Sequence, residues 1–147
     1  MARAASTEVK GRCERVVAPT DCATQWGNDG LEVLSTPAIL GYTEQLCAEV
    51  LAPHLGEGEM SVGVTATMHH RAAVPVGAKA VYSVTAEDVG RKTRFTFTVW
   101  DEAGTVVCEG THLRATVDVR RFLASLEGRA ERRLSASPPA RTPWKGQ

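Results

Sequence analysis

One stretch of the sequence decides the fold: STPAILGYTEQLCAEVLAP, residues 35–53. Thr36 is expected to cap a helix here, because its hydroxyl can accept a free backbone N–H of the first turn. Pro37 suits the first helical position, where its missing N–H costs nothing. Pro53 disfavours helical backbone at the residue before it. Between the two prolines most positions are apolar, and such a helix is normally buried. The stretch therefore predicts one buried helix bounded by Thr36 and Pro53.

Glu44 stands among the apolar residues of this helix. Thr36, Leu40 and Glu44 are spaced four apart, which places them roughly along one helical face. A hydroxyl at the start of a buried helix and a carboxylate two turns further along indicate a place where chemistry can occur.

The totals limit the class of protein. A chain of 147 residues suits one domain with a real core, and 17 basic against 17 acidic residues give no general case for binding nucleic acid. From residue 120 onward the chain has seven basic and two acidic residues, so this end is basic. No apolar run approaches the roughly 20 residues of a membrane span, and the first residues lack the apolar stretch of a signal peptide. A cytoplasmic protein is expected, without membrane or nucleic-acid partners.

The four cysteines are widely spaced and form no C-x-x-C pair, which argues against a zinc ribbon or a redox motif. Cys47 and Cys108 are expected to be reduced, buried and apolar in behaviour. His69 and His70 are neighbours in a predicted strand and point to opposite faces, so they make a poor single-metal site.

Strand patterns surround the helix. Phe95, Phe97 and Val99 alternate with polar residues, as in a strand with one buried face. The predicted strands cover residues 12–18, 60–73, 78–88, 94–100 and 105–119. Strands grouped around one segregated helix predict an α+β fold with an antiparallel sheet. One helix covers only one face of such a sheet and an edge stays open, so we expect a dimer.

The predicted domain spans residues 11–123. Residues 1–10 are expected to form a flexible leader, and residues 124–147 a basic, proline-containing tail without regular structure. The tail is expected to be solvated, with contact to coenzyme A phosphates as the alternative.

Several short motifs follow one another at characteristic spacings: VLST at 33–36, Glu44, Gly63, His70, AA at 72–73, Gly77 and GTHLRA at 110–115. Together they resemble the fluoroacetyl-CoA thioesterase family of bacterial hotdog hydrolases, over residues 31–122. The resemblance implies a hotdog fold, in which a five-stranded antiparallel sheet wraps a long central helix, and a homodimer, possibly a higher oligomer, with the acyl pocket near the subunit interface. It implies a coenzyme A thioester as substrate, with neither cofactor nor metal.

The resemblance also assigns roles to individual residues. Thr36, Glu44 and His70 match the family's catalytic threonine, glutamate and histidine. Gly63 matches a glycine whose backbone N–H serves the oxyanion hole, and Arg114 matches an arginine that supports the catalytic groups. The family's named enzyme carries phenylalanines before the threonine that select a fluorinated acyl group, whereas this chain has Gly27 and Gly30 there. We therefore expect hydrolysis of a small or medium acyl thioester without fluoroacetyl specificity.

Alternatives stay open at this stage. Glu44, Thr36 or a water molecule can make the first bond to the acyl carbon, and the thiol carrier can be coenzyme A or an acyl carrier protein. A non-catalytic hotdog module that binds an acyl group or another small ligand is the alternative function. A hotdog dehydratase fits less well, because the sequence lacks the Asp and Asn-Pro-x-His pattern of those enzymes.

Overall fold

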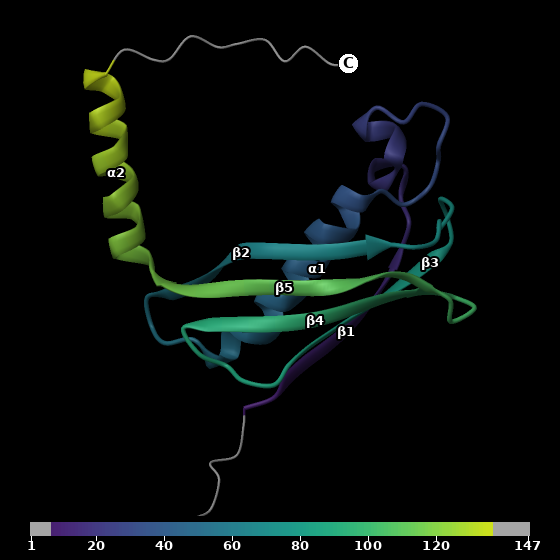
Figure 1. Cartoon of the computed structure of the whole chain (residues 1–147), viewed down its shortest axis with the longest axis horizontal. Helices are drawn as coiled ribbons and strands as arrows, with labels where there is room; N and C mark the ends of the chain where they lie inside the picture. Colours follow the sequence, from purple (N-terminus) through teal and green to yellow (C-terminus); the bar gives the residue numbers. More distant parts are fainter. Residues whose placement is uncertain (1–6, 137–147) are drawn as a thin grey trace, which may run out of the picture.

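The computed structural model describes residues 7–136, and its centre is one antiparallel sheet of five strands (Figure 1). The strands are β1 (Val9–Val16), β2 (Glu59–His70), β3 (Lys79–Ala86), β4 (Lys92–Asp101) and β5 (Val106–Asp118). They lie in the order β1-β3-β4-β5-β2, and all neighbouring pairs are antiparallel. The predicted α+β class with a five-stranded antiparallel sheet is confirmed.

Strand β2 lies at an edge of the sheet. It does not pair with β3, the next strand in the chain; it pairs with β5, from Glu59 opposite Asp118 to His70 opposite Cys108. The register shifts between Gly63 and Thr65, so β2 has a bulge. Few β2 residues are even half-buried, and its outer backbone edge has no neighbouring strand in the described part of the chain.

Helix α1 (Thr36–Leu51) packs across one face of the sheet (Figure 1). Ile39, Cys47 and Leu51 are completely buried on it, and the sheet contributes Phe95 and Val99 to the same core. Burying one large apolar side chain contributes roughly 1.5–3 kcal/mol, so this contact is the main stabilising layer. The prediction of a buried helix is confirmed.

The ends of α1 correct two predictions. Ser35, not Thr36, is the N-cap: its hydroxyl accepts the N–H of Ala38 at 3.2 Å. Thr36 is already helical, which frees its hydroxyl for another partner. Pro53 does not force Ala52 out of helical geometry, because Ala52 keeps φ −50° and ψ −44°. The chain continues as a short 3-10 turn, η3 (Ala52–His54).

Both ends of the predicted domain also differ from expectation. Val9 and Lys10 belong to β1 and pair with Ala86 and Thr85, so the leader is shorter than ten residues. Residues 124–135 are not irregular: they belong to helix α2 (Val119–Ser135), which is capped by Asp118. Arg, Leu, Ala and Glu all favour helix, which explains the difference. Residues 1–6 of the predicted leader and 137–147 of the predicted tail lie outside the described residues.

Within residues 7–136, neither α-helix has the length and apolar character needed to cross a bilayer.

Candidate active site

Thr36 and His70 form the first part of the candidate site. Thr36 is the first residue of α1 and His70 the last residue of β2, and the two elements bring them together. The Thr36 Oγ1 and His70 Nδ1 atoms are 2.8 Å apart, within hydrogen-bond distance, and both residues are exposed. A hydroxyl hydrogen-bonded to an imidazole is the arrangement in which the imidazole can activate the oxygen.

Glu44 and Gly63 form the second part, two turns further along α1. The Glu44 carboxylate lies against Gly63, so close that a Cβ atom at position 63 would collide with a carboxylate oxygen. The same Cβ would meet His112 Cε1 at 3.1 Å. Glycine is therefore required here by the approach of the catalytic candidate Glu44, and the side chain of Glu44 keeps 43% of its surface exposed.

A buried hydrogen-bond network stands behind Glu44. Arg114 is 7% exposed and donates to Ser61 twice, from Nε to Oγ and from a terminal nitrogen to the carbonyl oxygen, both at 2.9 Å. Its other terminal nitrogen lies 3.1 Å from His112 Nε2. Arg114 is therefore a buried arginine, and its guanidinium is fixed by these partners.

His112 is neutral in this network. Arginine has only donors, so His112 Nε2 accepts from Arg114 and the Nδ1–H donates to the Thr65 carbonyl at 2.9 Å. Burial lowers the pKa of His112 below its ordinary value, and nearby Arg114 adds to this; the Thr65 carbonyl and Glu44 act against it. Glu44 Oε1 lies 3.6 Å from Nε2. The two atoms form no hydrogen bond, because the distance is too long and Nε2 has no proton to donate.

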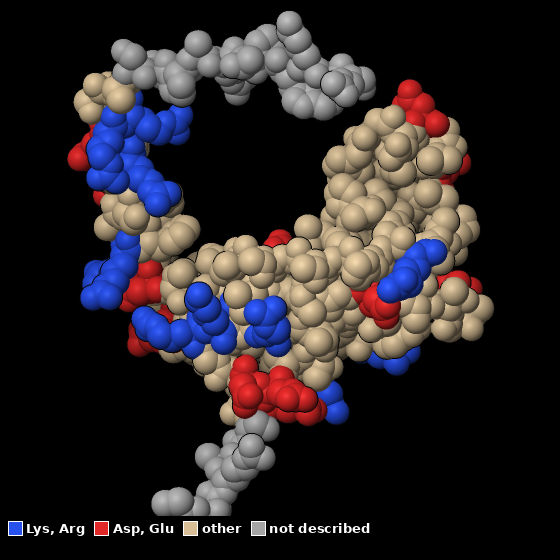
Figure 2. All heavy atoms as spheres, viewed as in Figure 1, with Lys and Arg blue, Asp and Glu red and all other residues tan. Residues whose placement is uncertain are grey.

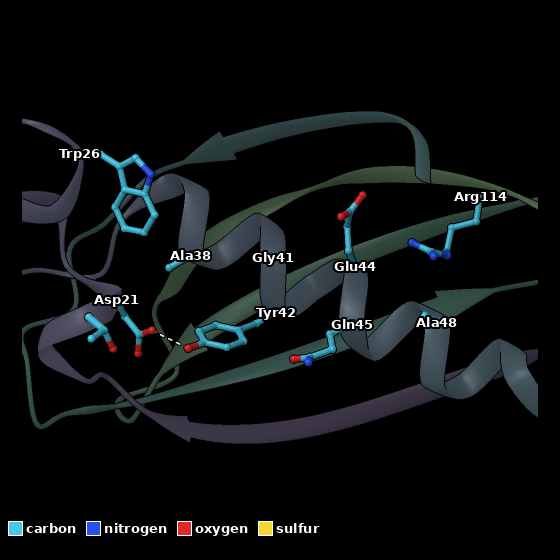
Figure 3. A pocket seen from close by; sticks show the side chains of 10 residues that line it. Asp21, Trp26, Ala38, Gly41, Tyr42, Glu44, Gln45, Ala48 and Arg114 are labelled. Atoms are coloured by element: carbon cyan, nitrogen blue, oxygen red, sulfur yellow. Dashed lines mark hydrogen bonds between the residues drawn. The ribbon is translucent and has the colours of Figure 1, made fainter. Parts of the chain in front are cut away.

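A groove runs along α1 beside Glu44 (Figure 3). Its volume is about 620 Å³, and small residues such as Ala38, Gly41 and Ala48 line it together with Gln45, Tyr42, Trp26, Thr20, Asp21, Glu44 and Arg114. At one end the Tyr42 hydroxyl donates to Asp21 at 2.5 Å, which raises the pKa of Tyr42. Arg15 lies over the Tyr42 ring at 3.6 Å, a cation–π contact.

The sequence reasoning missed several of these residues. The GTHLRA motif includes His112 but indicates no role for it, although His112 shares a strand face with Arg114 two residues away. No motif includes Trp26, although a large aromatic residue in the segment before α1 is a signal of contact. Ser61 and Asp21 carry no pattern that singles them out.

Within one protomer, the predicted residues form two groups and not one. Thr36 and Glu44 are eight residues apart on α1, which is about 12 Å along the helix axis. His70 and Gly63 are seven residues apart on β2, which is roughly 20 Å. Thr36 with His70 is one group; Glu44 with Gly63 and the Arg114 network is the other.

The cysteines behave as predicted at two positions. Cys47 and Cys108 are fully buried free thiols, and burial raises the pKa of Cys47 to about 12. In residues 7–136 no three His, Cys, Asp or Glu side chains are grouped to hold a metal ion.

Residues 17–120 match the sequence profile of the fluoroacetyl-CoA-specific thioesterases. The chain belongs to this family. A fluoroacetyl-CoA thioesterase from Streptantibioticus cattleyicolor is 30% identical over 96 residues, which are 65% of this chain and 68% of that protein. The chain is thus an acyl thioester hydrolase, as predicted.

Solved structures agree with this family membership. A hot-dog-like protein from Thermanaerovibrio acidaminovorans superposes with a TM-score of 0.76 and 28% identity, over 82% of this chain and 89% of that one. A single-residue variant of the fluoroacetyl-CoA-specific thioesterase, solved with fluoroacetate and CoA, superposes with a TM-score of 0.71 and 26% identity, over 77% of this chain and 95% of that one. A thioesterase superfamily member from Thermus thermophilus superposes with a TM-score of 0.81 and 19% identity, over 92% of this chain and 100% of that one. This similarity supports the fold alone. The hotdog fold of this thioesterase is confirmed.

Proposed function

We propose that this thioesterase hydrolyses a small or medium acyl-CoA thioester at a site shared between two protomers. Thr36, Glu44 and His70 carry the reaction, while Gly63 and Arg114 support it. The observation that carries the proposal is the Thr36–His70 hydrogen bond at one end of β2, together with the Glu44 carboxylate against Gly63 further along that strand. No cofactor or metal is part of the proposal.

The separation of the two groups within one chain supports a homodimer. Thr36 and Glu44 of one chain are about 12 Å apart along α1, too far for both to act on one thioester carbonyl. An antiparallel pairing of β2 with its own copy would reverse the strand direction across the interface. With the two-fold axis near Ala66 and Thr67, His70 of one protomer lies beside Gly63 of its partner. Thr36 and His70 then face the partner's Glu44.

The properties of β2 fit this pairing. An edge strand leaves a row of backbone N–H and C=O groups without partners, and natural proteins cover or block such edges. Here the edge is long, 12 residues, and Val64 is 49% exposed at its centre. A second copy covers the edge and completes the site in one step.

The chemistry follows from the positions. The oxygen of water or of Thr36 forms a bond to the thioester carbon, and its proton passes to the Glu44 carboxylate or the His70 imidazole. A backbone N–H at Gly63 would stabilise the oxyanion, and one such donor contributes about 3 kcal/mol in known enzymes. The C–S bond then breaks, and the thiolate takes up the proton. Where Thr36 attacks first, water hydrolyses the resulting ester.

The groove supports an acyl group larger than fluoroacetyl. Its volume of about 620 Å³ lies within the range of drug-sized ligand pockets. Gly27 and Gly30 have φ of +93° and +82°, a backbone region that bulky side chains avoid. Aromatic residues at these positions are therefore incompatible with this loop, and fluoroacetyl selectivity is not expected.

The proposal includes a cytoplasmic location. The four cysteines are free thiols in the structure, as expected for the reducing cytoplasm.

Complementation between two inactive variants tests the shared site. Thr36→Ala and Glu44→Gln are each expected to abolish most turnover of an acyl-CoA panel, followed with a thiol-reactive dye. Mixed after unfolding and refolding together, they form heterodimers in which one site has both native residues and the other has neither. Recovery of activity on mixing supports the shared site; a mixture as inactive as its components contradicts it. Full activity of Glu44→Gln and of His70→Ala alone would contradict the catalytic assignment itself.

A further inference from the structure

The exposed large apolar side chains are not scattered over the molecule. Nine are exposed in the described chain, and eight of them lie on three elements. Trp26 and Leu31 lie in the segment before α1, Met60 and Val64 on β2, and Phe122, Leu123, Leu126 and Leu134 on α2. Exposed large apolar side chains gathered on few elements in this way indicate surfaces for interaction.

Helix α2 stands away from the sheet, and none of its residues is buried (Figure 1). Phe122, Leu123 and Leu126 are spaced at i, i+1 and i+4 and form one apolar stripe of the helix. Five arginines and two glutamates give α2 a net charge of +3, and basic side chains cover it in Figure 2. An amphipathic helix with an uncovered stripe of this kind requires a partner to bury it.

The segment 20–34 has the complementary character. It contains Asp21, Asp29 and Glu32 and no Lys or Arg, which gives a net charge of −3. Trp26 is 51% and Leu31 53% exposed. The segment is held to the body by backbone hydrogen bonds, from Leu34 to the Val74 carbonyl and from Ser35 to the Asp21 carbonyl, so its surface is presented on a fixed loop.

The two regions occupy opposite ends of β2. Helix α2 follows Asp118, which pairs with Glu59, the first residue of β2. The segment 20–34 leads into Thr36, which contacts His70, the last residue of β2. Both regions rise past the β2 edge on the same side, with a hollow between them (Figures 1 and 2).

We propose that α2 of each protomer docks on segment 20–34 of its partner and forms the outer wall of the partner's acyl groove. The inference rests on the β2-to-β2 dimer of the proposed function. With His70 beside the partner's Gly63, antiparallel pairing lays the first part of one β2 along the last part of the other. Helix α2, which follows β5 at the start of β2, then comes to the side of the partner that carries segment 20–34. The charges of +3 and −3 then face one another, and the apolar stripe covers the half-exposed indole of Trp26.

This docking completes the acyl site with a residue from the second chain. Trp26 lines the groove beside α1, and the partner's Phe122 lies on the stripe that covers it. The groove is then enclosed between an indole and a phenyl ring, surfaces that suit the apolar part of an acyl chain. The partner's α2 is therefore a specificity-determining element for acyl groups that reach Trp26.

Photo-crosslinking tests the docking without any assumption about activity. A benzoylphenylalanine is placed at position 122 in an isotopically labelled chain, which is mixed with unlabelled chain so that dimers exchange. Irradiation is expected to join position 122 to a peptide of segment 20–34 from the other chain. Position 124, on the opposite side of α2, is the matched control and should give no such product. A crosslink to its own chain, to the partner's α2 or to nothing overturns the proposal.

A kinetic experiment tests the consequence for the substrate. Phe122→Glu is expected to raise KM for longer acyl-CoA substrates roughly tenfold, the loss expected when one phenyl contact is removed. Ala124→Glu makes the same charge change on the other side of the helix and should leave KM unchanged. Equal KM values for both variants overturn the role of α2 in the groove. If no variant or wild-type protein turns over any thioester, the proposed function fails, and the crosslink still decides the docking.

Discussion

Thr36 and His70 are both exposed and share one hydrogen bond, whereas Arg114 and His112 are buried and take part in four. Both groups are parts of one candidate site, yet the fold depends on them differently. A hydrogen bond between exposed groups adds little to stability, because water replaces it. A buried charged group that loses its partners is costly. If the proposed site is correct, the Arg114 group therefore contributes to both stability and catalysis, whereas the Thr36 group contributes to catalysis alone.

Glu44 lies between these extremes and gives the largest expected effect. Glu44→Gln keeps the size of the side chain but removes the charge and the basicity, so kcat is expected to fall by about a thousandfold, as for loss of a general base. Glu49→Gln is the control, because Glu49 is at an exposed position of the same helix. This substitution should change kcat by a factor of about two or less. Steady-state rates with one acyl-CoA substrate check the pair. Equal rates for the two variants would remove Glu44 from the reaction.

Arg114→Met breaks the buried group. Ser61 and His112 lose their donors, and a loss of about 3 kcal/mol in the free energy of unfolding is expected. Urea denaturation measures it. Arg94→Met on β4 is the control, because Arg94 is exposed and a surface substitution usually changes stability by about 0.5 kcal/mol or less. Similar midpoints for both variants would show that the Arg114 contacts contribute nothing net.

A third prediction uses the titration of His112. Its pKa is lowered in the folded protein from an ordinary value of 6.5, so the unfolded chain binds the proton more readily. The contribution of His112 to the free energy of unfolding is then fully present above pH 6.5. It is lost as the pH falls through the lowered pKa of the folded protein. Urea midpoints measured from neutral pH downward should fall in the wild type. In His112→Gln this part of the fall should be absent; an unchanged pH profile would mean that His112 does not bind its proton on unfolding in this window.

The contrast also explains what the sequence could predict. The two prolines and the apolar pattern mark α1 closely, because helix signals are local. Alternation predicted the buried face of β4 for the same reason. The position of β2 at the edge, far from β3 in the sheet, depends on pairing with β5 residues that lie 38 to 59 positions away in the chain, and no local pattern encodes it. The sequence therefore predicted candidate site residues without showing that they form two groups.

Two smaller errors have the same origin. Ser35 and Thr36 are both capping residue types, and only the backbone decides which one is half outside the helix. The basic, proline-containing composition of residues 124–147 predicts a solvated tail, although the residues up to 135 favour helix and their leucines follow one face. Composition alone cannot tell a disordered charged segment from an amphipathic helix whose partner is absent.

The smallest expected effect on stability concerns the adjacent residues Ser35 and Thr36. Ser35 is buried and is expected to act in stability, whereas Thr36 is exposed and is expected to act in the reaction. Ser35 is 4% exposed and caps α1, so Ser35→Ala should cost about 1 kcal/mol in unfolding free energy and keep most of the activity. Thr36→Val keeps the shape of the side chain and removes only the hydroxyl that contacts His70. It should cost about 0.5 kcal/mol or less and lose most of the activity.

Urea denaturation and acyl-CoA turnover of both variants decide the matter, and each variant serves as the control for the other. The expected results cross over: the less stable variant is the more active one. Variants that lose stability and activity in proportion would show that Thr36 acts only through the helix N-terminus. That outcome would leave the Thr36–His70 hydrogen bond as a structural contact and place the chemistry on the Glu44 group alone.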